Sequence, residues 1–260
     1  MCLVVLEMSV ERIMQRLVQS WFGLAQGDAD AALDKVEIKK YTYNENAEDG
    51  PMVESKTTGH ETLVHPKLRK RITPDLQRVG TRFLCRHFSP TTLTVNALTG
   101  YLDELEAHKH YQPDVLIIDY PDLMQHNQER LRSDLENTYQ RLRALAIERE
   151  CAVVVASQSN RSSMTRRQVT LAHVAESVGK VHVSDHVVTY SQTDTEHAIG
   201  FARLFVAKSR YDRSHFMVLL SQSYANGQFC VSALPMPGRT AYFDAVGSDG
   251  PDDDGEERDD

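Results

Sequence analysis

Three polar residues stand at the ends of short apolar runs, and their side chains suit phosphate chemistry. Glu7, Asp119 and Gln158 each lie at or just beyond the end of such a run. A carboxylate there can hold Mg²⁺ while the metal bridges phosphate oxygens, a glutamate can polarise an attacking water, and a neutral amide can sense a phosphate by hydrogen bonding. Taken one at a time, each has an ordinary alternative: Asp119 could cap a turn, Glu7 could reach solvent, and Gln158 could belong to a loop. Their occurrence at three strand ends of one predicted sheet favours a nucleotide site.

Two groups of basic residues could complete such a site or bind its partner. Lys208 and Arg210 come directly after a predicted strand, where alternation directs both to one side. They could offer two cations to the phosphates held by a neighbouring subunit, or they could form a solvated strand end. Arg161, Arg166 and Arg167 lie in a Ser- and Thr-rich segment that could follow a nucleic-acid backbone. A plain surface loop is the alternative for that segment.

The elements that must position these residues alternate along the chain. Short apolar runs predict strands buried on both faces, and amphipathic stretches between them predict helices. This order predicts an α/β fold with a mostly parallel sheet flanked by helices. In such sheets ligands bind at the carboxyl edge of the strands. The expected strands cover 2–6, 82–87, 115–119, 152–156, 187–190 and 203–207, the expected helices begin at Ser9 and cover 94–109 and 127–150, and a hairpin at 216–232 turns near Asn226-Gly227.

Composition sets the class of protein and its setting. The 260 residues are enough for one sizeable core, which we assign to 1–240. The net charge of −8 comes mainly from residues 249–260, so 241–260 is expected to be an acidic disordered tail on a nearly neutral body. No apolar run reaches the length of a membrane span, and the four dispersed cysteines indicate reduced thiols in a cytoplasmic protein. The 11 histidines show no zinc-ligand spacing.

Four segments in this order resemble the RecA-like ATPase domain of DnaB-like replicative helicases, especially those of phages. They are Val-Leu-Glu-Met at 5–8, Leu-Ile-Ile-Asp-Tyr-Pro-Asp-Leu-Met at 116–124, Val-Val-Ala-Ser-Gln-Ser-Asn-Arg at 154–161, and Val-Ala-Lys-Ser-Arg at 206–210. The resemblance covers about residues 1–235. It implies a P-loop NTPase core, ATP and Mg²⁺ as cofactors, single-stranded DNA and a hexameric ring as partners, no membrane, and the cytoplasm of a bacterial or phage-infected cell.

The resemblance also implies a role for each candidate residue. Glu7 corresponds to the acid that activates water, and Asp119 to the acid associated with Mg²⁺. Gln158 corresponds to the sensor of the γ-phosphate. Lys208 and Arg210 correspond to the pair inserted into the ATP site of the next subunit. The segment that carries the three arginines resembles a loop that faces DNA.

The chain departs from the family in the phosphate-binding loop, which would read Gly-x-x-x-x-Gly-Lys-Ser/Thr. No glycine begins this pattern, and the single Gly-Lys pair, Gly179-Lys180, is followed by Val181. In the family this loop precedes the strand that carries Glu7. We therefore expect a helicase-type ATPase lacking that segment, through a late start, a split gene or a genuine short product. The alternatives are a non-catalytic subunit that docks into a related ring, and another RecA-like ATPase, which the Asp-Tyr-x-x-Leu-Met motif disfavours.

Overall fold

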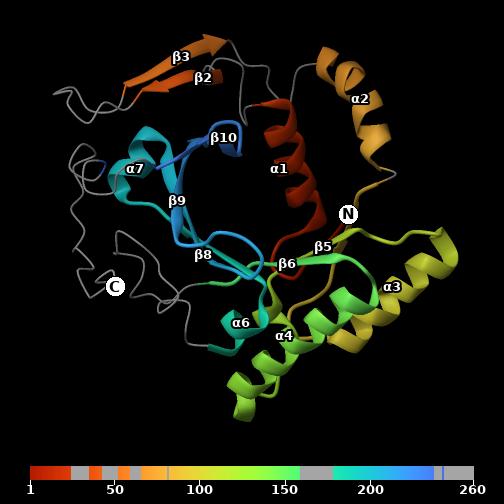
Figure 1. Cartoon of the computed structure of the whole chain (residues 1–260). Helices are drawn as coiled ribbons and strands as arrows, with labels where there is room; N and C mark the ends of the chain where they lie inside the picture. Colours follow the sequence, from red (N-terminus) through yellow and green to blue (C-terminus); the bar gives the residue numbers. More distant parts are fainter. Residues whose placement is uncertain are drawn as a thin grey trace, which may run out of the picture. The chain divides into compact units, whose positions relative to one another are not determined.

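The computed structural model describes residues 1–24, 35–42, 52–58, 66–80, 82–158, 178–236 and 242 (Figure 1). The chain divides into two compact units, named here for their sheets. Among the described residues, the parallel-sheet unit consists of 1–15, 69–80, 82–158 and 178–184, and the antiparallel-sheet unit contains the others.

The parallel-sheet unit is built on four strands in the order β4-β1-β5-β6. These are β4 (Leu84–His87), β1 (Cys2–Val5), β5 (Val115–Asp119) and β6 (Ala152–Val155), and each neighbouring pair is parallel. The predicted strands are therefore confirmed, although β4 begins two positions later than expected. The central strands are apolar because helices and neighbouring strands cover them, and Val4, Leu116 and Ile118 have no exposed surface.

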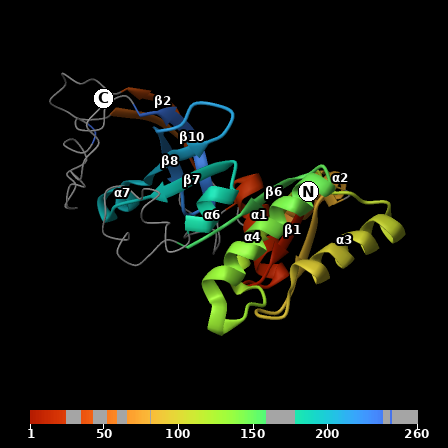
Figure 2. The same ribbon diagram turned by 60° about the horizontal axis from the view of Figure 1, so that its bottom comes forward.

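Two long helices cover this sheet and form the core with it. Helix α3 (Val95–Lys109) begins at Thr94, whose hydroxyl accepts a hydrogen bond of 3.1 Å from the backbone N–H of Ala97. Helix α4 (Leu131–Glu148) follows two 3₁₀ turns, η2 (Pro121–Leu123) and η3 (Gln128–Arg130). Figure 2 shows α3 and α4 side by side. The helix residues that pack into the core are Val95, Leu98, Leu102, Leu105, Leu142 and Leu145.

Three further helices belong wholly or partly to this unit. Helix α1 (Val10–Phe22) begins at Ser9 as predicted, and the Ser9 hydroxyl accepts a hydrogen bond of 3.4 Å from the Arg12 backbone. Helix α2 (Pro66–Gly80) precedes β4, and the short α6 (Val178–Val183) contacts α4. Within the described residues no helix has both the length and the apolarity needed to cross a bilayer.

The antiparallel-sheet unit is built on a four-stranded sheet. Its strands β7 (His186–Ser191), β8 (Phe201–Ser209), β9 (Phe216–Ser223) and β10 (Gln228–Pro235) pair in the order β10-β9-β8-β7, all antiparallel. The strands predicted near 187–190 and 203–207 are confirmed as β7 and β8, which pair with each other. Only residues 192–200 connect β7 to β8, and a parallel crossover needs a dozen residues or more. The predicted β9–β10 hairpin is confirmed, and a separate pair, β2 (Lys35–Thr42) and β3 (Met52–Thr58), is also antiparallel.

The reversal between β7 and β8 is made by a short capped helix, α7 (Asp194–Ile199). Thr193 and Glu196 form a reciprocal capping box at its start. Gly200 ends the helix with φ +74, and a Cβ there would lie 3.0 Å from the backbone oxygen of Gln222. Glycine is needed at this position both for the left-handed backbone and for the close approach of β9.

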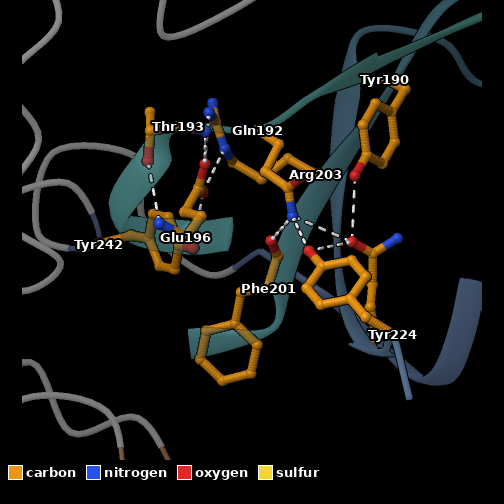
Figure 3. A network of polar contacts seen from close by, with 9 residues as sticks. Tyr190, Gln192, Thr193, Glu196, Phe201, Arg203, Tyr224 and Tyr242 are labelled. Carbon is orange, nitrogen blue, oxygen red and sulfur yellow. Dashed lines mark hydrogen bonds and ion pairs between the residues drawn. The ribbon is translucent and has the colours of Figure 1, made fainter. Parts of the chain in front are cut away.

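A buried ion pair lies beside this helix (Figure 3). The guanidinium of Arg203 donates to both carboxylate oxygens of Glu196, at 2.6 and 2.9 Å, and both residues are at most 1% exposed. The hydroxyl of Tyr242 donates to the same carboxylate at 2.8 Å, and the backbone N–H of Thr193 donates to it at 2.7 Å. Every oxygen of this carboxylate is thus bonded within the chain, which identifies the cluster as structural.

Candidate nucleotide-binding edge

The parallel-sheet unit brings Glu7, Asp119 and Gln158 to one edge. Glu7 follows β1, Asp119 is the last residue of β5 and Gln158 follows β6, and these three strands are adjacent in the sheet. Val5 is in register with Asp119, and the backbone N–H of Leu6 donates to the Asp119 carbonyl at 3.0 Å. Because all strands of this sheet are parallel, their carboxyl ends share that edge. Glu7 and Gln158 are exposed there, and Asp119 is half-buried.

The Tyr120 hydroxyl connects two of these strand ends, and the pKa of Tyr120 is affected by the carboxylates around it. The Gln158 side-chain amide donates to the Tyr120 hydroxyl at 3.2 Å. Burial raises the pKa of Tyr120, and the nearby carboxylates of Glu7, Asp122 and Asp119 raise it further. Among the described residues, neither Glu7 nor Asp119 forms an ion pair. The edge is therefore negatively charged and suited to a cation.

The residues present fit Mg²⁺ in the form that nucleotide sites use. Mg²⁺ is usually bound through one or two carboxylates, with waters and substrate phosphates filling its octahedral shell. Asp119 supplies such a carboxylate at the edge of the sheet. No cluster of three or more potential metal ligands occurs in the described part of the chain. Waters or phosphate oxygens would supply the remaining ligands of a divalent ion at Asp119.

Lys180 is a member of this region that sequence reasoning missed. Its amino group lies 2.6 Å from a carboxylate oxygen of Asp122 and 3.2 Å from the hydroxyl of Ser157. The amino group also lies 5.2 Å from the centre of the Tyr139 ring. The sequence signal was a charged residue inside the apolar stretch Val-Gly-Lys-Val, because a charge in such a stretch requires a partner.

The structure places Lys208 and Arg210 in the antiparallel-sheet unit. Strand β8 runs to Ser209, so Lys208 lies inside it and only Arg210 follows it. The strand is longer than predicted because β7 pairs with it as far as its end. Arg210 is bound to Asp185 twice, through its backbone N–H to the Asp185 carbonyl at 2.9 Å and through its guanidinium to the carboxylate at 2.9 Å. This ion pair is open to solvent, with the two side chains 40% and 37% exposed.

Some predicted features lie outside the described residues. These are Arg161, Arg166 and Arg167, together with the acidic segment 241–260 apart from Tyr242.

The parallel sheet flanked by helices defines an α/β protein, and the acids at the carboxyl ends of its adjacent strands mark the edge where such proteins bind ligands. The model of the DnaB-like helicase C terminal domain matches residues 88–224 of this chain. The chain therefore belongs to the DnaB-like helicase C-terminal domain family. The matched span contains Asp119, Gln158, Lys208 and Arg210, whereas Glu7 precedes it.

Individual relatives agree with this assignment. The DnaB-like replicative helicase of Enterobacteria phage T4 is 26% identical over 137 residues, which are 50% of this chain and 28% of that protein. The chain thus spans about a quarter of the length of this curated relative.

Two solved structures share the fold. A DnaB-like replicative helicase, whose interactions with primase were also described, has a TM-score of 0.63 at 16% identity, with 88% of this chain and 51% of that chain covered. The second structure, which is described as an ATPase domain, has a TM-score of 0.64 at 15% identity, with 88% and 73% covered.

Proposed function

We propose that this chain forms part of the ATPase motor of a phage-type replicative helicase, which couples ATP hydrolysis to movement along single-stranded DNA. One observation carries the proposal. Glu7, Asp119 and Gln158 meet at one edge of a parallel sheet, and among the described residues neither acid has a cationic partner. A negatively charged edge costs stability unless a ligand neutralises it. Mg²⁺ bound with ATP is the ligand that suits these side chains and this family.

Each residue then has a definite task. Asp119 orients the metal–nucleotide complex, and bound Mg²⁺ neutralises negative charge on the phosphates. Glu7, exposed beside it, accepts the proton of the attacking water. Gln158 changes its hydrogen bonds according to the presence of the γ-phosphate, and its amide is held by Tyr120 until then. Because Asp119 and Gln158 stand at the carboxyl ends of adjacent strands, a single phosphate chain can contact both.

The remaining proposed partners follow from family membership. Lys208 and Arg210 act on the nucleotide of the next subunit in a homo-hexameric ring, and Arg161, Arg166 and Arg167 contact single-stranded DNA. Such a motor works in the cytoplasm of a bacterial or phage-infected cell. The alternative is a non-catalytic subunit that docks into a ring of related full-length helicase. That role uses Lys208 and Arg210 alone and requires no nucleotide of its own.

The decisive experiment uses a fusion of this chain to a family segment that contains a Gly-x-x-x-x-Gly-Lys-Ser/Thr loop. We call this fusion the loop-supplied protein. ATP turnover is measured with saturating Mg²⁺ in the presence and absence of single-stranded DNA. We expect DNA-stimulated hydrolysis that Asp119→Asn abolishes. Asp114→Asn is the matched control, because Asp114 precedes the same strand at its opposite end and is exposed. Equal activity of Asp119→Asn and the parent would refute the site.

The 260-residue chain alone is expected to hydrolyse ATP very weakly, because the 260 residues contain no phosphate-binding loop pattern. The same turnover assay measures this. Robust turnover that disappears in Asp119→Asn would show that another segment binds the phosphates. If the loop-supplied protein were also inactive but the short chain joined a related helicase ring, the non-catalytic role would be the correct one.

A further inference from the structure

Lys180 is a buried lysine of the parallel-sheet unit whose amino group contacts two separate segments of the chain. It lies on α6 and is 9% exposed. Its amino group reaches three partners from three other segments: the Asp122 carboxylate at 2.6 Å, the Ser157 hydroxyl at 3.2 Å and the Tyr139 ring at 5.2 Å. Burial and the Asp122 charge raise the pKa of Tyr139, so its hydroxyl stays neutral beside the cation. The lysine is therefore neutralised by Asp122.

The partners of Lys180 adjoin the proposed catalytic edge. Asp122 lies in η2, three residues after Asp119 along the chain. Ser157 is the residue directly before Gln158. One amino group thus joins the turn after the metal-associated acid to the strand end that carries the phosphate sensor. The hydrogen bond from Gln158 to Tyr120 connects the same two strand ends a second time.

Helix α6 is held where this bridge can form. Gly179 lies so close to α4 that a Cβ there would come within 2.7 Å of side-chain carbons of Glu136. Arg143 of α4 donates to the backbone carbonyl of Val183 at the end of α6. These contacts hold α6 against α4 (Figure 1), and Lys180 reaches Asp122 and Ser157 from there.

We propose that Lys180 is a positioning residue that sets the orientation of Gln158 relative to Asp119. This inference rests on the proposed nucleotide site. Ser157 and Lys180 also stand on either side of residues 159–177, which include the arginines assigned to DNA. The hydrogen bond between them joins the two ends of that segment.

The competing explanation is a plain structural ion pair in which Lys180 only neutralises Asp122. The two explanations differ for a double variant. Lys180→Met leaves Asp122 without its cation, and adding Asp122→Asn removes the uncompensated charge. Both explanations expect the double variant to recover thermal stability. Only the positioning role expects Ser157 and Gln158 to stay perturbed, because the double variant still lacks the amino group that contacts both residue 122 and Ser157.

The first measurement uses the 260-residue chain and needs no catalysis. Amide hydrogen exchange is followed at Ala156, whose N–H donates to the Ile118 carbonyl. It is measured in the parent, in Lys180→Met, in the double variant and in the control Lys109→Met, which changes an exposed lysine at the end of α3. We expect exchange about tenfold faster in Lys180→Met and in the double variant, since a hydrogen bond from a charged donor contributes on that order. The control should match the parent. Parent-like exchange in the double variant would overturn the proposal.

The second measurement uses the loop-supplied protein. Lys180→Met should lower kcat on the order of tenfold, as for other residues that orient the ligands of a metal site, while KM for ATP changes less. DNA stimulation should fall with kcat, and the double variant should not restore either. Unchanged kcat, or its recovery in the double variant, would overturn the inference. An inactive parent would refute the proposed function, and the exchange measurement would still decide the role of Lys180.

Discussion

The acids at the edge of the parallel sheet differ from two acids of the antiparallel-sheet unit in whether they form ion pairs. In the antiparallel-sheet unit, Glu196 is fully buried and bonded to Arg203, and Asp185 is paired with Arg210. At the edge of the parallel sheet, Glu7 and Asp119 have no ion-pair partner among the described residues. A paired, buried carboxylate contributes to structure, whereas an unpaired acid at a strand end is available to a ligand. We therefore expect changes at the buried ion pair to lower the free energy of unfolding, and changes at the candidate site to lower ATP turnover.

The largest effect on ATP turnover is expected at Arg210, whose ion pair with Asp185 is more exposed than the pair of Arg203 and Glu196. In the loop-supplied protein, Arg210→Ala should lower ATP turnover by about 10³-fold or more, as removal of an arginine that completes a phosphoryl-transfer site does. Steady-state ATPase assays check this. Arg213→Ala is the matched control, since Arg213 is exposed three residues further along.

Mixing subunits tests whether Arg210 acts across an interface. Arg210→Ala and Glu7→Gln subunits, each inactive alone, should regain some ATPase activity together, because some interfaces then pair an intact Glu7 with an intact Arg210. Mass measurement verifies the mixed oligomers. Absence of any recovery in verified mixed rings would count against action in trans.

Glu7→Gln should lower turnover by roughly 10²–10⁴-fold, the usual contribution of a general base. Nucleotide binding should largely persist, because the carboxylate acts on water and Asp119 orients the metal. Binding of a fluorescent ATP analogue and single-turnover hydrolysis separate the two steps. The free energy of unfolding should change by less than about 0.5 kcal/mol, as for other exposed side chains. A large stability loss would show that Glu7 is structural.

Arg203→Met should show the reverse pattern, with a large loss of stability. Removing one partner of a buried ion pair costs about 3–5 kcal/mol, because Glu196 would keep a buried, uncompensated charge. Urea unfolding of the 260-residue chain measures this. Adding Glu196→Gln should recover part of the loss. A change below about 1 kcal/mol would mean that solvent reaches the carboxylate, against its 0% exposure.

The smallest effect is expected for Asp185→Asn. Its ion pair with Arg210 is more than a third exposed on both sides, so solvent screening limits its contribution to less than about 1 kcal/mol. The same urea experiment checks this beside Arg203→Met. In the loop-supplied protein, ATP turnover should not fall, because Arg210 loses only a competing partner. A stability loss equal to that of Arg203→Met would contradict the conclusion that only the buried ion pair contributes strongly to stability.

The amino-acid sequence by itself determined the four parallel strands, the helices α3 and α4, the β9–β10 hairpin and the edge that carries Glu7, Asp119 and Gln158. These features depend on local apolar runs and on turn residues such as Gly227, whose φ is +60. Only the tertiary structure decided that β7 and β8 pair antiparallel, since strand direction depends on how far the connection reaches in space. It also decided the partners of Lys180, Arg203 and Arg210. These ion pairs join residues that are 7 to 58 positions apart, and no sequence period records which charges the fold brings within a few ångströms of one another.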